Sequence, residues 1–127
     1  MEKKVLSKSS KKILVIDDDA SILDAIALIL EEEGYHVDTI VKSEETYNKV
    51  RDFNPDLILL DVLMSGNDGR HICKKLKTED YSKNIPIIMI SAHPTAEKSI
   101  TECGADGFIA KPFRSTQLLK EVKKHLG

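Results

Sequence analysis

The chain has 127 residues, 41% of them hydrophobic and 31% charged, so its length allows one domain and its apolar content excludes an intrinsically disordered chain. Nineteen basic against 21 acidic residues give a formal net charge of −2, which argues against a strongly basic nucleic-acid-binding protein. No apolar run approaches the roughly 18 residues that would span a bilayer, and the lysine-rich start lacks the apolar core of a signal peptide. We therefore expect one cytoplasmic domain without a nucleic-acid or membrane partner.

The basic start of the chain differs in composition from the remainder. We expect residues 1–10 to be a flexible basic leader and residues 11–127 to form the folded domain. Cys73 and Cys103 form neither a disulfide framework nor a metal-ligand spacing, which is typical of a reducing compartment. Both cysteines are interpreted as small residues of the core.

Five short apolar runs alternate with helix-like segments, and this alternation predicts an α/β fold with five repeats of strand and helix. In chain order the runs are 13–16, 35–40, 57–60, 85–90 and 108–110. The run at 35–40 mixes in polar residues and is expected at an edge of the sheet. The other four are nearly continuously apolar, as expected for parallel strands that helices cover on both faces.

Apolar residues at helical spacing predict a helix after each of these runs. The expected helices lie near 20–33, from 43 to 52–55, around 72–76, over 96–103 and through 118–126. Asp19 is the expected cap of the first helix, and Gly34 supplies the left-handed residue that ends it. Ser115 is the expected cap of the last helix, and Gly104 ends the fourth.

Polar residues follow four of the five runs at the point where each strand is expected to end. They are Asp17, Asp18, Asp19, Asp61, Ser91 and Lys111. Any one of them alone is an ordinary turn or cap residue. Together they are expected to meet, because the carboxyl ends of parallel strands share one edge of an open sheet, where ligands bind.

Carboxylates gathered at that edge require a cation. Two carboxylates 4 Å apart repel by about 4 kcal/mol at an effective dielectric of about 20, and one lysine cannot neutralise three of them. Mg²⁺ binds through one or two carboxylates, retained waters and a phosphate oxygen. The pattern therefore predicts a Mg²⁺ and phosphate site, with Asp61 on the third strand as the best-placed nucleophile.

Four segments carry a resemblance to a known family. They are ILVIDDD at 13–19, LILLD at 57–61, PIIMISA at 86–92 and GADGFIAKPF at 104–113. In this order they resemble receiver domains of two-component response regulators, in particular single-domain regulators of the chemotaxis type. The resemblance implies a flavodoxin-like (βα)5 three-layer sandwich with a five-stranded parallel sheet of order 2-1-3-4-5.

The resemblance also implies a role for each residue at the strand ends. Asp61 corresponds to the phosphoacceptor, which receives a phosphoryl group from a phosphohistidine on a partner. Asp17 and Asp18 correspond to the acidic pair that holds Mg²⁺ beside Asp61, and the backbone carbonyl of Leu63 corresponds to a further ligand. Lys111 corresponds to the lysine that pairs with the phosphoryl group, and its peptide bond to Pro112 matches one that is cis in the family.

The switch residues follow from the same resemblance. Ser91 corresponds to the hydroxyl residue that moves onto the phosphoryl group, and Phe108 to the aromatic residue that swings inward with it. Their joint shift would change the face built by the fourth helix, fifth strand and fifth helix. A partner could read that face, or the phosphoryl group could pass onward to a histidine phosphotransfer protein.

Two departures from the family pattern affect the site. Ser65 replaces the usual proline in the loop after Asp61, which predicts a looser loop and slightly weaker Mg²⁺ binding. Leu63 and His93 occupy the two variable positions that tune hydrolysis of the phosphoryl group. Since leucine cannot hydrogen-bond the attacking water, we expect slow self-dephosphorylation.

We thus expect a phosphoacceptor that receives its phosphoryl group from a sensor histidine kinase or a histidine phosphotransfer protein. We do not expect an enzyme that acts on a separate substrate. Three other interpretations stay open. A degenerate receiver could act only as a scaffold. Asp17, Asp19 and Ser21 loosely resemble the start of haloacid-dehalogenase-type phosphatases, although the chain is short for such an enzyme. A flavodoxin-like binding module would need a Ser/Thr-rich phosphate loop, which the first strand lacks.

Overall fold

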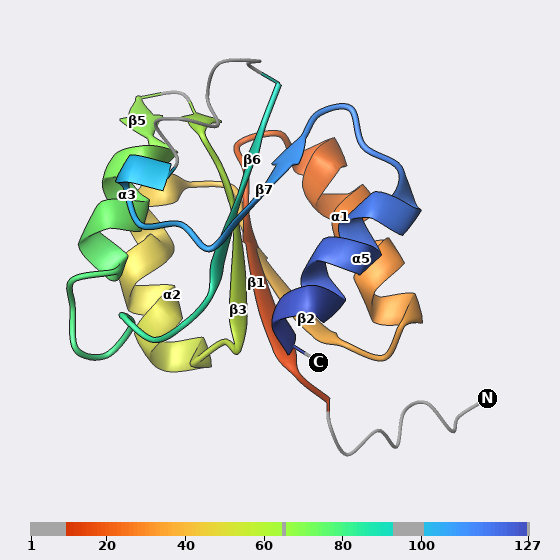
Figure 1. The fold of residues 1–127 in the computed structure, drawn as a ribbon, viewed down its shortest axis with the longest axis horizontal. Helices are drawn as coiled ribbons and strands as arrows, with labels where there is room; N and C mark the ends of the chain where they lie inside the picture. The colour runs from red at the N-terminus through yellow and green to blue at the C-terminus, as the bar shows by residue number, and fades with distance from the viewer. Residues whose placement is uncertain (1–9, 65, 93–100, 127) are drawn as a thin grey trace.

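The protein is built around a central sheet of five parallel strands (Figure 1). A computed structural model describes residues 10–64, 66–92 and 101–126. The strands are β1 (Lys12–Ile16), β2 (His36–Ile40), β3 (Leu57–Asp61), β6 (Ile87–Ser91) and β7 (Gly107–Ala110). Their order is β2-β1-β3-β6-β7, which is 2-1-3-4-5 when these strands are counted along the chain. The predicted fold class and strand order are confirmed, and β2 lies at an edge as expected.

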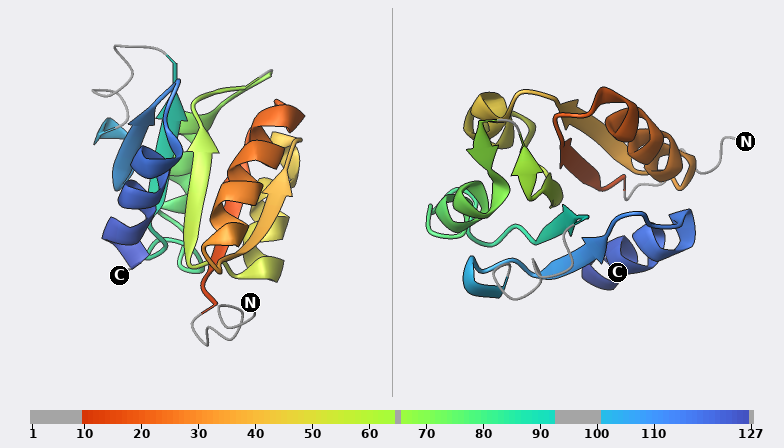
Figure 2. Two further views of the ribbon diagram at one scale, coloured as in Figure 1. Left: turned by 90° about the vertical axis from the view of Figure 1, so that its right-hand side faces the viewer. Right: turned by 90° about the horizontal axis from the view of Figure 1, so that it is seen from above.

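Helices cover both faces of this sheet in three layers (Figures 1 and 2). The helices α1 (Ala20–Glu32) and α5 (Ser115–Leu126) pack on one face, and α2 (Thr46–Phe53) and α3 (Gly69–Leu76) pack on the other. None of the helices within the described residues is long and apolar enough to cross a membrane.

Alternation along each central strand feeds two separate cores. In β1, Ile13 and Val15 belong to the core under α1 and α5, whereas Leu14 and Ile16 belong to the core under α2 and α3. All four side chains are buried. Burying a side chain of this size stabilises the fold by about 2 kcal/mol relative to leaving it in water. The central strands are therefore held from both sides.

The helix ends agree with the sequence at α1 and differ at α5. Asp19 caps α1 by accepting a hydrogen bond from the Ser21 N–H at 3.0 Å, and Gly34 follows the helix with φ +96°. At α5 the predicted cap was wrong, because Ser115 is already inside the helix. The Arg114 carbonyl accepts the first helical bonds, and the Arg114 N–H donates to Gln117 Oε1 at 2.8 Å. A glutamine at the third helical position thus replaces the expected hydroxyl.

Other boundaries differ from the prediction by a few residues. The run at 85–90 pairs only from Ile87, because the Ile85 N–H bonds the Ser82 carbonyl in a turn and Pro86 has no N–H. A 3-10 turn over Ser43–Glu45 precedes α2, and an unpredicted hairpin of β4 (Leu63–Met64) and β5 (Asn67–Asp68) follows β3. The expected fourth helix lies mostly outside the described residues, with 101–102 helical, and so do residues 1–9 of the leader expected over 1–10.

Candidate functional site

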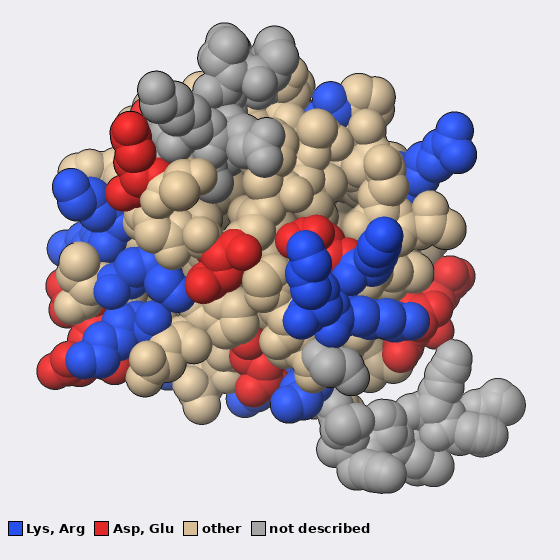
Figure 3. Space-filling model, viewed as in Figure 1, with Lys and Arg blue, Asp and Glu red and all other residues tan. Residues whose placement is uncertain are grey.

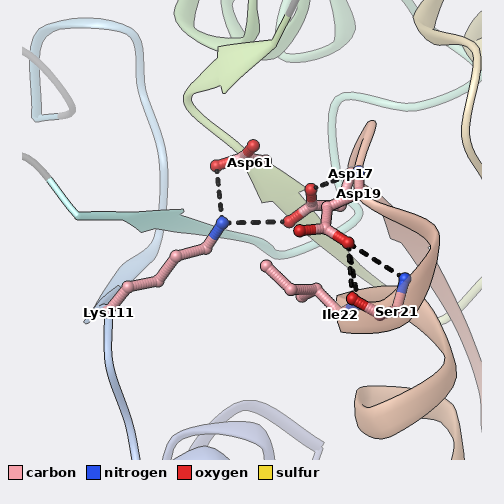
Figure 4. Close-up of polar contacts among 6 residues, drawn as sticks. All are labelled: Asp17, Asp19, Ser21, Ile22, Asp61 and Lys111. Atoms are coloured by element: carbon pink, nitrogen blue, oxygen red, sulfur yellow. Dashed lines mark hydrogen bonds and ion pairs between the residues drawn. The ribbon is translucent and has the colours of Figure 1, made fainter.

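Lys111 lies between two buried carboxylates at the carboxyl end of the sheet (Figure 4). Its Nζ is 3.1 Å from Asp17 Oδ2 and 3.3 Å from Asp61 Oδ1. Asp17 follows β1, Asp61 ends β3, and Lys111 follows β7, so three strands deliver one residue each. Asp17 is 2% exposed and Asp61 5% exposed. The structure therefore brings together three residues that the sequence placed on one edge.

Asp18 completes an acidic group at the same edge. Carboxylate oxygens of Asp17, Asp18 and Asp61 all lie within 4.8 Å of one another, although Asp18 itself is exposed. Three hard oxygen donors, with one side of the group open to water, are the ligand set that Mg²⁺ prefers in proteins. The residues present therefore fit a divalent cation of this kind.

The electrostatics of Asp61 reflect this crowding. The pKa of Asp61 is raised from 3.8 to about 6, chiefly by burial and next by the charge of Asp17, while Lys111 acts in the opposite direction. Burial lowers the pKa of Lys111, but hydrogen bonding to Asp17 and the charge of Asp61 outweigh that effect, so its pKa is raised overall. Lys111 thus stays protonated while the carboxylates beside it keep an excess of negative charge.

The turn after β1 fixes the carboxylate of Asp17. Its Oδ1 accepts a hydrogen bond from the Asp19 N–H at 3.0 Å, and the Asp17 N–H donates to the Ile40 carbonyl at 3.2 Å. The Asp19 carboxylate turns away to cap α1 (Figure 4). Hydrogen bonds from Ser21 lower the pKa of Asp19. Asp19 is thus a helix cap, as predicted.

Gly69 is a residue of the site that the sequence interpretation missed. Its N–H donates to the Val62 carbonyl at 2.7 Å, so the first turn of α3 lies directly against the backbone after β3. A β-carbon at Gly69 would overlap the carbonyl oxygen of Asp61. The glycine after Asp68 in the printed sequence was the available signal for this close approach.

Asn67, which the sequence interpretation also missed, anchors the loop after Asp61. Asn67 Nδ2 donates to Ser43 Oγ at 2.6 Å, which joins the β4–β5 hairpin to the start of the α2 segment. The Leu63 side chain in this hairpin is 55% exposed, so it stands in water beside the site. The predicted metal-ligand role of its carbonyl stays a prediction.

The expected switch residues lie on neighbouring strands. Ser91 ends β6 and is 1% exposed, and its carbonyl accepts a hydrogen bond from the Lys111 N–H at 2.9 Å. Phe108 pairs with Met89 in the β6–β7 ladder and packs, partly buried, against the core under α2 and α3. The peptide between Lys111 and Pro112 is cis, as the resemblance implied. The expectations for Ser65 and His93 concern positions outside the described residues.

Comparison with known proteins agrees with this geometry. Residues 13–123 match the response regulator receiver domain family. The chain belongs to this family. It is 33% identical over 118 residues to the DNA-binding response regulator MtrA of Mycobacterium tuberculosis H37Rv, covering 91% of this chain and 50% of that protein. It is 36% identical over 115 residues to the phosphate regulon regulator PhoB of Pseudomonas aeruginosa, covering 89% and 50%.

Solved structures give the same assignment. A putative response regulator from Chloroflexus aurantiacus superposes with a TM-score of 0.87 at 31% identity, covering 91% of this chain and 97% of that chain. The Vibrio cholerae chemotaxis protein CheY4 gives a TM-score of 0.85 at 29% identity, covering 91% and 98%. The receiver thus matches nearly the whole of these two structures, whereas it spans about half the length of the curated relatives.

Proposed function

We propose that Asp61 accepts a phosphoryl group from a phosphohistidine of a sensor histidine kinase or histidine phosphotransfer protein. The observation that carries this proposal is the Asp61 carboxylate, which is 5% exposed and lies beside one lysine and two further carboxylates. The ammonium of Lys111 can bind phosphoryl oxygens, and the carboxylates can bind a cation. The arrangement therefore favours a phosphoryl group together with a cation.

In the proposed step, a carboxylate oxygen of Asp61 attacks phosphorus. The new O–P bond forms as the P–N bond to the donor imidazole breaks, and the imidazole leaves with that electron pair and takes up a proton. The ammonium of Lys111, 3.3 Å from Asp61 Oδ1, is placed to balance charge on the transferring group. The hydroxyl of Ser91 is proposed to hold another phosphoryl oxygen.

The carboxylates of Asp17, Asp18 and Asp61 would hold Mg²⁺, together with the carbonyl of Leu63. When bound, the ion supplies positive charge that orients the phosphoryl oxygens and offsets carboxylate repulsion. We infer that the chain catalyses only its own phosphorylation and dephosphorylation, and that it does so in the cytoplasm, where histidine kinases present their phosphohistidine.

A groove beside Lys111 supports docking of the phosphodonor. It has a volume of about 470 Å³ and runs between α1 and the segment after β7, with an almost entirely apolar lining that includes Ile22, Ala25, Ile29 and Phe113. A partner helix seated here would bring its phosphohistidine to Asp61. Replacing Ile29 by lysine should slow transfer from the partner protein while leaving phosphorylation by a small acyl phosphate unchanged.

Phosphorylation is proposed to shift Ser91 and Phe108 together and so to alter the surface of β7 and α5 that a downstream protein reads. Direct recognition of DNA by the described residues has no support from surface charge. On the face shown in Figure 3, basic and acidic side chains are interspersed, and the net charge is −2.

The proposal is tested by incubating the protein with a small acyl phosphate and Mg²⁺ and measuring intact mass. Wild type should gain about 80 Da, one phosphoryl group, and the Asp61→Asn variant should gain nothing. Asp19→Asn is the matched control, because Asp19 caps α1 and should leave the gain intact. Equal labelling of wild type and Asp61→Asn, or no labelling of wild type, would refute the assignment.

A further inference from the structure

Two cysteines lie next to each other in the core on the side of the sheet away from α1 and α5. Cys73 is in α3, and Cys103 follows the helical residues 101–102 in the turn that leads to β7. Neither forms a disulfide, and both belong to one core, with Cys73 fully buried and Cys103 7% exposed. The Cys73 thiol donates to the Cys103 carbonyl oxygen at 3.6 Å.

The surroundings make the two thiols chemically unequal. Hydrogen bonding with Cys73 lowers the pKa of Cys103, against the effect of burial and with help from the Ala105 N–H and the charge of Arg70. The same hydrogen bond and burial raise the pKa of Cys73. Cys103 is thus the more acidic thiol and the less buried residue of the pair, whereas Cys73 is the weaker acid and is fully buried.

The turn that carries Cys103 is held against α3 by a separate set of polar contacts. Lys77, directly after α3, donates from Nζ to Asp106 Oδ2 at 2.9 Å and to the Ile85 carbonyl at 2.9 Å. Asp106 Oδ2 also accepts a hydrogen bond from the Ile87 N–H at 2.9 Å. These bonds tie the residue after α3 to the turn that carries Cys103, and they keep the two cysteine-bearing segments side by side.

We propose that Cys73 and Cys103 are an oxidation site, where hydrogen peroxide forms a reversible intramolecular disulfide. The Cys103 thiolate attacks a peroxide oxygen, which breaks the O–O bond, leaves a sulfenic acid on Cys103 and releases hydroxide. The Cys73 sulfur then attacks the Cys103 sulfur, which breaks the S–O bond and releases the second oxygen as water. Two thiols lose two electrons and two protons, and one peroxide becomes two water molecules.

The disulfide would join α3 to the turn that enters β7. This cross-link would lie in the core under α2 and α3, and neither cysteine contacts Lys111 or Asp61 in the bonds described above. It would close a loop that includes β6, and a loop closed in the unfolded chain stabilises the folded state. The oxidised protein should therefore unfold at a higher temperature than the reduced protein.

The test is to treat the reduced protein with a small excess of hydrogen peroxide and to measure intact mass, titratable thiols and thermal unfolding. Wild type should lose about 2 Da and both thiols, and dithiothreitol should restore them. Digestion without reduction should yield a cross-linked pair of peptides containing Cys73 and Cys103, a readout that needs no variant.

Variants then separate the two roles. Cys73→Ala leaves Cys103 without a resolving thiol, so this variant should gain about 16 or 32 Da, and Cys103→Ala should react much more slowly than wild type. Wild type that keeps both thiols, gains oxygen without losing 2 Da, or forms only dimers through intermolecular disulfides would overturn the proposal. Because none of these readouts involves phosphorylation, the result stands apart from the proposed role of Asp61.

Discussion

Two lysine–aspartate clusters lie at opposite ends of the same sheet, and they differ in charge balance. At the amino ends of β6 and β7, Lys77 pairs with Asp106 at 2.9 Å, and the remaining contacts of this pair are to backbone groups. The cluster has one positive and one negative charge, and its hydrogen bonds join segments that lie next to each other. This cluster fastens α3, β6 and β7 together.

The cluster at the carboxyl ends holds one lysine against three carboxylates. Lys111 contacts Asp17 and Asp61, and Asp18 lies within reach of both carboxylates. The excess negative charge contributes to raising the pKa of Asp61 to about 6. The comparison shows that the charges of one cluster balance within the fold, whereas the other cluster keeps an excess of negative charge that a divalent cation could offset.

Removing the lysine from the unbalanced cluster should have the largest effect. Lys111→Met leaves two buried carboxylates without their cation and should lower the free energy of unfolding by about 3 kcal/mol in metal-free buffer at neutral pH. The rate of phosphorylation by a small acyl phosphate should fall about 100-fold. Chemical denaturation and timed intact-mass measurements check the two effects. Wild-type rates in this variant would remove Lys111 from the phosphoryl site.

Neutralising Asp61 should stabilise the metal-free protein. Because the pKa of Asp61 is raised from 3.8 to about 6, the folded state binds more protons than the unfolded state in this window, and stability falls as pH rises through it. The Asp61→Asn variant has no carboxylate at this position, so its stability does not fall in this way as pH rises. It should be more stable than wild type by about 2 kcal/mol at pH 7.5 and nearly equal to it below pH 4. Denaturation series with a chelator present measure both; a constant difference across pH would contradict the electrostatic cause.

Crowding the backbone behind Asp61 tests its placement without changing any charge. Gly69→Ala puts a β-carbon against the Asp61 carbonyl oxygen, so stability should drop by about 2 kcal/mol and phosphorylation should slow. Gly66→Ala, in the β4–β5 hairpin that precedes α3, is the matched control. Gly66 has φ +77° and no atom within 4 Å of an added β-carbon, so only backbone strain of about 1 kcal/mol is expected. Equal effects at the two glycines would show that the close approach is unimportant.

The balanced cluster should give the smallest response. Lys77→Met removes a partly exposed pair whose Asp106 side chain is 37% exposed, so the loss of stability should be about 1 kcal/mol. Phosphorylation should be unchanged, because this pair lies at the other end of the sheet. A loss of phosphorylation as large as that of Lys111→Met would break the distinction between the clusters.

The fold could be predicted well from the sequence because the patterns that define its strands and helices are periodic or repeat along the chain. Continuous apolar strands, Asp19 before α1 and Gly34 after it each carry their signal locally. Asp61 and Lys111 were also predictable, since parallel strands must end at one edge and each residue stands directly after its strand. Site residues could therefore be chosen by position within an element.

What could not be predicted depends on contacts between distant segments. The need for glycine at 69 arises from the backbone after β3, and the Lys77–Asp106 pair joins residues 29 positions apart. The capping of α5 was missed because Gln117 supplies the acceptor from inside the helix. The Cys73–Cys103 contact likewise has no local signal, since two cysteines so spaced are ordinary core residues in most folds.

Asp61 is also the last paired residue of β3, where it faces Ile90 in the ladder, and the next amide, that of Val62, donates to the Ile90 carbonyl at 2.9 Å. This strand is buried along its whole length between two neighbours. Asp61, the proposed nucleophile, is therefore expected to belong to the part of the molecule that opens only when the entire domain melts. On heating, the capacity to be phosphorylated and the native fold should disappear together in a single transition.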